Sequence, residues 1–151
     1  MHDYRDLSRQ MERTVHKYIQ WEKKTHCYGP GIVLSQAEIH TIAVIGDNPD
    51  INITELARQR GVTKGAASQM IYKLVEKGLV EKQVSPNSDT EVVLKLTDSG
   101  NVAYLSHQKF HEESNEQFMK TLGALPEDYE QFMMEFLREF EETMDKRLNE
   151  K

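Results

Sequence analysis

The chain has 151 residues, of which 29% are charged and 38% hydrophobic, and its formal net charge is −6. This length suits one compact domain with additional helices. No apolar run reaches the roughly 18 residues that a membrane helix requires. No apolar stretch of a signal peptide follows the start of the chain, and the single cysteine, Cys27, cannot form an internal disulfide. We therefore expect a cytoplasmic protein that does not enter a membrane.

The charges are distributed unevenly along the chain. Residues 54–84 contain six basic and three acidic side chains, a net charge of +3, whereas residues 112–151 contain five basic and twelve acidic ones, a net charge of −7. This division predicts that the middle of the chain faces an anion and that the tail stays away from it.

Apolar spacing and turn residues predict the first four helices. The first covers residues 3–26 and the second begins at Ser35, where a glutamate three residues later completes a capping box. Thr54 is expected to cap a third helix over 55–60, and Thr63 a fourth over 64–77. A four-residue turn over 60–63 joins these two short helices, so they form a helix-turn-helix.

Two predicted strands follow, over residues 79–84 and 91–96, with turn residues between them. A hairpin directly after a helix-turn-helix is the wing of a winged helix. A fifth helix is expected from Asp98 to about residue 122, and a sixth over 127–149 after a proline.

The predicted fold is mainly α with a small β wing. A winged helix-turn-helix DNA-binding domain covers residues 35–97, and dimerisation helices cover 1–34 and 98–151. The first and last helices carry more apolar surface than the small core can cover. We expect a second copy to cover it in a two-fold homodimer, the alternative being a monomer whose helices fold back on themselves.

The fourth helix would place its N-terminal half in the major groove of a double-stranded DNA operator. Gln69 suits adenine, and Lys64 suits guanine or a phosphate. On an isolated helix these side chains would form an ordinary solvated face, but the adjoining wing favours DNA binding. The predicted DNA-contacting residues are Thr54, Arg58, Thr63, Lys64, Ser68, Gln69, Tyr72 and Lys73.

Some of the six histidines stand in a pattern that suits a metal ion. His107 and His111 are four residues apart and share one helical face, His40 has apolar neighbours, and Glu22 continues an apolar stripe. Taken singly, each residue has a simpler structural explanation, such as a surface pair or a hydrogen-bonded core histidine. Gln108 stands where a zinc protease needs its glutamate, and other catalytic motifs are absent, so no enzyme is predicted.

Several segments together resemble the MarR family of bacterial transcriptional regulators over nearly the whole chain. The resemblance implies a homodimeric DNA-binding regulator that responds to an effector. At the wing, Ser88 and Thr90 replace the family's usual Asp-x-Arg, so DNA affinity is expected to depend more on the fourth helix. The segments are Ile53-Thr54-Glu55-Leu56-Ala57, Gly61-Val62-Thr63, Ala67-Ser68, Leu74-Val75-Glu76-Lys77-Gly78-Leu79-Val80 and Leu94-Lys95-Leu96-Thr97-Asp98-Ser99-Gly100.

Within that family the chain resembles the zinc-responsive, AdcR-like repressors of zinc uptake. This resemblance implies zinc as co-repressor, held by Glu22, His40, His107 and His111. Three imidazoles and a carboxylate suit Zn²⁺ and also accept Ni²⁺, Co²⁺ or Cu²⁺. A second zinc site of that branch would fall on Tyr28, Ile39 and Ser106, which cannot act as ligands in the same way, so one well-formed site is expected.

Three other interpretations remain. The regulator would respond to a small aromatic ligand, with His40 in the wall of its pocket, or to oxidation of Cys27, whose neighbours include Lys23, Lys24 and His26. Outside the regulators, the chain would be an adaptor that binds a protein through its amphipathic helices. Its affinity for DNA would then be absent or insensitive to salt.

Overall fold

The computed structural model describes residues 3–114 and 116–150, without the side chains of 111–114, 117 and 118. It divides into two compact units, Met1–Phe110 and His111–Lys151. In chain order the elements are α1 (Arg5–Glu22), β1 (Thr25–Cys27), β2 (Val33–Ser35), α2 (Gln36–Asp47), α3 (Ile53–Arg60), α4 (Lys64–Glu76), β3 (Val80–Ser85), β4 (Ser88–Leu96), α5 (Asp98–Ser114), α6 (Glu116–Gly123) and α7 (Glu127–Asn149).

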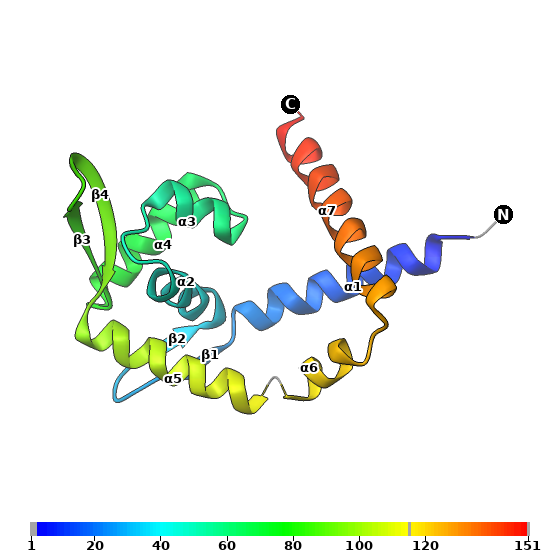
Figure 1. Ribbon diagram of the computed structural model, residues 1–151, viewed down its shortest axis with the longest axis horizontal. Coiled ribbons are helices and arrows are strands. Elements are labelled where there is room, and N and C mark those ends of the chain that lie inside the picture. The colour runs from blue at the N-terminus through cyan, green and yellow to red at the C-terminus, as the bar shows by residue number, and fades with distance from the viewer. Residues whose placement is uncertain (1–2, 115, 151) are drawn as a thin grey trace. The chain divides into compact units, whose positions relative to one another are not determined.

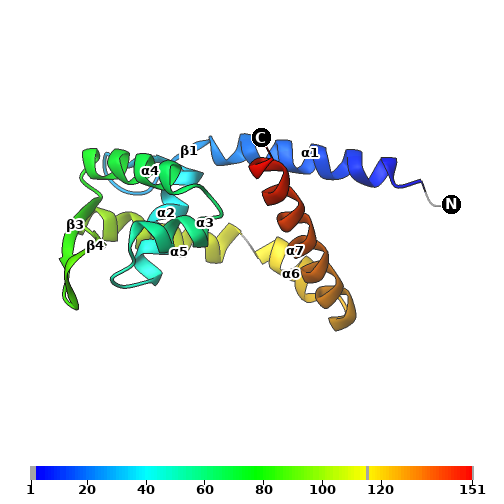
Figure 2. The ribbon, with the colours of Figure 1, turned by 90° about the horizontal axis from the view of Figure 1, so that it is seen from above.

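The first unit is built around α2, which packs against α3, α4, β2 and β4 (Figures 1 and 2). Apart from Tyr28 its core is mainly aliphatic, and helix α5 joins it through Ala103, which is fully buried. Removing this apolar surface from water is the main force that holds the helices together. The largest fully buried side chains include Leu34, Ile39, Ile42, Leu56, Ile71, Leu74 and Leu94.

The end of α1 differs from the sequence prediction. The helix ends at Glu22 rather than at residue 26, and residues 25–27 instead pair with 33–35 in a small antiparallel sheet. Gly29 and Gly31 have positive φ angles, and Tyr28 N donates to Ile32 O at 2.8 Å, which turns the chain back on itself. Such glycines predict only the end of a helix, so the hairpin was not predicted.

The helix caps agree with the prediction except at α3. Ser35 and Glu38 form the expected capping box of α2, and Thr63 Oγ1 accepts from Ala66 N at the start of α4. The cap of α3 is Asn52, whose Oδ1 accepts from Glu55 N at 2.9 Å. The prediction of Thr54 as this cap was wrong, because the helix already begins at Ile53 and Thr54 lies within it.

The wing is an antiparallel hairpin of β3 and β4 in which Ser85 pairs with Ser88. Its second strand begins three residues before the predicted start at 91, so the turn is tighter than expected. Leu94 N donates to Ile51 O, and Asn52 Nδ2 donates to Glu91 Oε1 at 2.7 Å. These bonds fix the base of the wing to the residues that open α3.

The second unit contains α6 and α7. The sequence predicted one helix from Asp98 to about residue 122, whereas the structure has α5 to Ser114 and α6 from Glu116. Residue 115 lies outside the described residues, so the continuity of this helix stays a prediction. None of the helices in the described part of the chain is long and apolar enough to span a lipid bilayer.

Gly100 packs so closely that we expect alanine to destabilise the fold. A Cβ atom there would lie 2.0 Å from the carbonyl oxygen of Leu79, which is backbone and cannot rotate away. Overpacking of this kind costs about 1–3 kcal/mol. Gly65→Ala is the matched control, since its Cβ would meet open space and alanine favours a helix. In urea unfolding, the midpoint concentration should be lower than that of the wild type only for Gly100→Ala. Equal midpoints for both variants would contradict the packing argument.

Candidate nucleic-acid interface and histidine cluster

The predicted DNA-contacting residues lie on the solvent side of the helix-turn-helix. Helix α4 turns Ala67, Ile71 and Leu74 into the core, and its opposite face is available to a ligand. Next to that face, a Cβ at Gly65 would have no neighbour within 4 Å, so the backbone is open to close approach. Ser68 is half-buried, and the exposed residues of the predicted set are Thr54, Arg58, Thr63, Lys64, Gln69, Tyr72 and Lys73.

The wing offers little positive charge at its tip. Ser88 Oγ lies 3.4 Å from Thr90 Oγ1, and Asp89 between them is exposed. On the neighbouring strand β3, Lys82 is exposed. The prediction did not include this basic side chain among the DNA contacts. The signal was present in the sequence, because Lys82 belongs to the basic segment 54–84.

The structure brings together three of the four predicted metal ligands. Glu22 ends α1 and His40 lies on α2, with Glu22 Oε1 3.9 Å from His40 Nδ1. The rings of His40 and His107 have centroids 5.4 Å apart, and His107 on α5 is only 4% exposed. Three elements that are distant in sequence therefore meet at one partly buried polar cluster, called the histidine cluster below.

Aromatic rings surround the histidine cluster. Trp21 contacts His40 at a centroid distance of 5.5 Å, and Tyr28 contacts His107 at 5.9 Å. Gln36 Nε2 donates to the Tyr28 hydroxyl at 3.0 Å inside the core, and burial raises the pKa of this tyrosine above its usual range. These packed rings hold the two imidazoles in place.

A basic residue that the prediction did not assign to this cluster also reaches Glu22. Arg60, the last residue of α3, donates from Nη2 to Glu22 Oε1 at 3.5 Å. The contact joins residues 38 positions apart, which no local pattern in the sequence indicates.

The residues present suit a transition-metal ion by their chemistry, since imidazole and carboxylate are its common ligands. Glu22 and His40 already approach each other, and His107 adds a second buried imidazole. Among the side chains that the structure describes, however, no three histidine, cysteine, aspartate or glutamate residues converge closely enough to hold an ion. The side chain of His111, the fourth predicted ligand, lies outside the described residues.

Other candidate residues have simpler surroundings. Cys27 is exposed at the end of β1 and its Sγ contacts Gly29 O at 3.2 Å. Tyr28 and Ile39, at two positions of the second zinc site, are buried core residues. We therefore find no structural support for a second site at these positions.

A small cavity of about 140 Å³ lies next to the histidine cluster. Glu22 and Arg60 line it on one side, and Leu56, Ala67 and Met70 give it an apolar wall.

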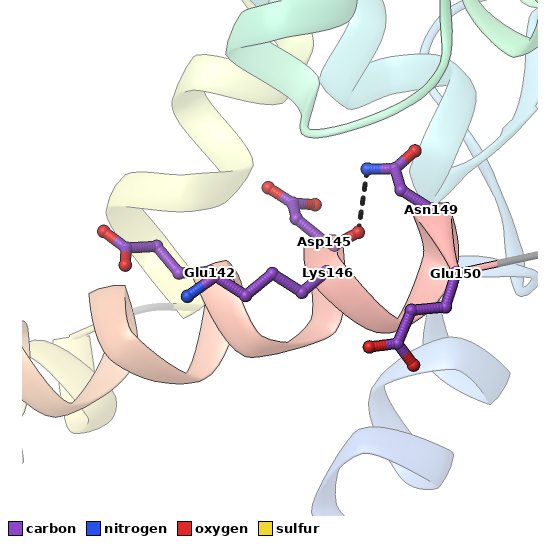
Figure 3. A pocket seen from close by; sticks show the side chains of 5 residues that line it. All are labelled: Glu142, Asp145, Lys146, Asn149 and Glu150. Carbon is purple, nitrogen blue, oxygen red and sulfur yellow. Dashed lines mark hydrogen bonds between the residues drawn. The ribbon is translucent and has the colours of Figure 1, made fainter.

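A hollow on α7 is different in kind (Figure 3). It is lined from this helix end alone, by Glu142, Asp145, Lys146, Asn149 and Glu150, so no side chains converge there from separate elements.

Glu38 ties the start of α2 to the end of α4. Its Oε1 accepts from Lys77 Nζ at 2.7 Å, and its Oε2 accepts from Ser35 N at 2.9 Å. Burial acts to raise the pKa of Glu38, but the hydrogen bonds from Lys77 and Ser35 outweigh it and hold the pKa below its usual value of 4.5.

The lowered pKa of Glu38 predicts a loss of stability in acid. A carboxyl whose pKa is lower in the folded state stabilises the fold fully above its unfolded pKa, and this contribution is lost as the pH falls through the folded pKa. The difference in unfolding free energy between the wild type and Glu38→Gln should therefore shrink as the pH falls below about 4.5. Urea unfolding of both proteins across the acid range measures it, and a difference that stays constant with pH would contradict the prediction.

Comparisons with known proteins support this picture of the fold. The model of the MarR family matches residues 34–88. YhjH of Bacillus subtilis strain 168, an uncharacterized HTH-type transcriptional regulator, is 24% identical over 139 residues, which cover 84% of this chain and 79% of YhjH.

Solved structures extend the likeness to almost the full chain. FabT of Streptococcus pneumoniae, solved in complex with DNA, has 22% identity and a TM-score of 0.66, covering 95% of this chain and 99% of its own. ZitR of Lactococcus lactis, a zinc-responsive MarR family member, has 14% identity and a TM-score of 0.64, covering 94% and 99%. At these identities the likeness is one of fold, a winged helix of the MarR type, as the sequence predicted. The family match over the helix-turn-helix and the start of the wing, together with the fold, makes this chain similar to the transcriptional regulators of the MarR family.

Proposed function

We propose that this chain is a homodimeric DNA-binding repressor that uses zinc as its co-repressor. The observation that carries the proposal is the meeting of Glu22, His40 and His107 directly beside the helix-turn-helix. The fold that the chain shares with the zinc-responsive ZitR supports it.

The residues of the histidine cluster would connect the helical frame to the DNA-reading helices. Glu22 comes from α1, His40 from α2, and His107 and His111 from α5. A zinc ion supplies a positive charge with four preferred ligand directions. Holding these side chains together restrains α2 against α1 and α5, and α2 packs directly on α3 and α4. The orientation of α4 is thereby restrained as well.

Restraint of this kind matters when two copies read one operator. Two recognition helices must match half-sites about one helical turn apart. A homodimer would present them, and exposed apolar side chains on α1 offer a surface for it. In the single chain no residue of α1 is buried, and the apolar side chains of Leu7, Val15, Tyr18 and Ile19 are 44–55% exposed. A second copy is the partner that covers such a stripe in a symmetric regulator.

The small cavity supports a second candidate effector. Its volume of about 140 Å³ and its apolar wall would suit a single aromatic ring, since an apolar cavity of about 150 Å³ can hold benzene. If such a ligand is the effector, an aromatic acid should change DNA affinity in protein that has been stripped of metal.

Selection of duplexes from a random pool, with and without zinc, tests the proposal. We expect zinc to tighten binding to the selected operator, and added salt to weaken it because phosphate contacts release counterions. Sedimentation should give a dimer. An operator bound equally well with and without zinc would overturn zinc as co-repressor. No binding to any duplex would overturn DNA recognition and favour the adaptor.

A further inference from the structure

The carboxylate of Glu22 lies between two competing partners. One oxygen, Oε1, accepts a hydrogen bond from Arg60 Nη2 at 3.5 Å and lies 3.9 Å from His40 Nδ1. The imidazole belongs to the proposed metal site, whereas the guanidinium belongs to the helix-turn-helix. The same atom cannot serve a metal ion and the arginine equally well, since a guanidinium fork and a divalent cation repel each other.

Partial burial strengthens this competition. The side chains of Glu22, His40 and Arg60 are 26%, 16% and 19% exposed. Charges in such surroundings are screened less by solvent and salt than exposed charges are. Burial and the charge of Glu22 also raise the pKa of Tyr18, which places a second side chain of α1 within the influence of this carboxylate.

Arg60 lies in the chain shortly before α4, the helix proposed to read DNA. It is the last residue of α3, Gly61 follows in a left-handed conformation, and Thr63 then caps α4. Glu22 and Arg60 also line the cavity of about 140 Å³ next to α4. The Arg60 side chain therefore has open space on the side of this cavity.

We propose that Arg60 is an internal competitor for Glu22, which holds the helix-turn-helix to α1 without metal and is displaced when metal binds. The inference rests on the proposed zinc site and adds a positioning residue to it. Without metal, Arg60 and Glu22 join α3 to α1. With metal, Glu22 turns to the histidines and Arg60 leaves it. Because binding free energies are reciprocal, Arg60 lowers metal affinity by the factor by which metal weakens the Arg60–Glu22 contact.

Zinc titration against a competing chromophoric chelator tests this inference on the full-length chain. We expect Arg60→Met to bind zinc roughly tenfold more tightly than the wild type, within the usual range of coupling between sites. Arg60→Lys keeps the positive charge and should stay near the wild-type affinity. Arg13→Met removes an exposed arginine of α1 and should leave the affinity unchanged.

A metal-free measurement separates competition from a general loss of structure. A double-mutant cycle compares the unfolding free energies of four metal-stripped proteins: the wild type, Glu22→Gln, Arg60→Met and the double variant. If the two side chains are in direct contact, the two single losses of unfolding free energy should not add up to the loss in the double variant. If the wild type binds zinc and Arg60→Met binds it no more tightly, the inference is wrong but the proposed zinc site is not contradicted. Additive effects in the cycle would also overturn it. Wild type that binds no zinc would overturn both the inference and the proposed zinc response.

Discussion

Replacing His40 with alanine is expected to weaken zinc binding at least a hundredfold. Changes that only disturb the partners of a metal ligand already cost about 10–100-fold in affinity, and His40 would be a ligand itself. The imidazole lies 3.9 Å from the Glu22 carboxylate and beside His107, so its loss removes the central donor of the histidine cluster. A joint His107→Ala and His111→Ala variant should bind no measurable zinc.

A competition titration near neutral pH measures these losses. His16→Ala is the matched control, because His16 is an exposed histidine on α1 away from the predicted ligands. Glu22→Gln tests the carboxylate with little change of shape, and far-ultraviolet circular dichroism verifies that each variant is folded. Acid should also release the ion, since histidine must be neutral to act as a ligand. Zinc affinity that is the same in His40→Ala and the wild type would reject the site.

The sequence predicted those parts of the fold that depend on local chemistry. Ser35 with Glu38, and Thr63 with Ala66, form the caps that their spacing indicated, because a cap is made within four residues. The small sheet of β1 and β2 was missed for the opposite reason. No glycine or proline precedes Gly29 to end the predicted helix earlier, and only the pairing of 25–27 with 33–35, across the glycine turn, selects a strand.

In the candidate site, too, some residues could be predicted from the sequence and others depend on tertiary packing. Glu22, His40 and His107 were placed by resemblance to a family, and they meet in the structure although 85 residues separate the first from the last. Arg60 was assigned no role, because its contact with Glu22 depends on how α3 packs beside the end of α1. A basic residue in a helix-turn-helix is more simply taken as a DNA contact. Only tertiary structure distinguishes an arginine that faces DNA from one that holds a carboxylate.

On the DNA-binding surface, Gln69→Ala and Lys73→Ala are expected to separate sequence recognition from charge. Both side chains are exposed on α4. Gln69 would read a base edge, so its loss should weaken binding to the selected operator by about 1–3 kcal/mol and relax specificity at that base pair. Lys73 would contact a phosphate, so its loss should weaken binding to all duplexes alike and reduce the salt slope by about 1.

Fluorescence anisotropy with the operator and with a scrambled duplex, at several salt concentrations, distinguishes these effects. Lys17→Ala removes an exposed lysine of α1 and should leave both affinities unchanged. If Gln69→Ala weakens binding to the operator and to the scrambled duplex equally, then Gln69 does not recognise a base. Because Thr90 stands where the family usually has the arginine of the wing, α4 would supply most of the discrimination. In that case the next candidates for base recognition would be Lys64 and Ser68, in the N-terminal half of the same helix.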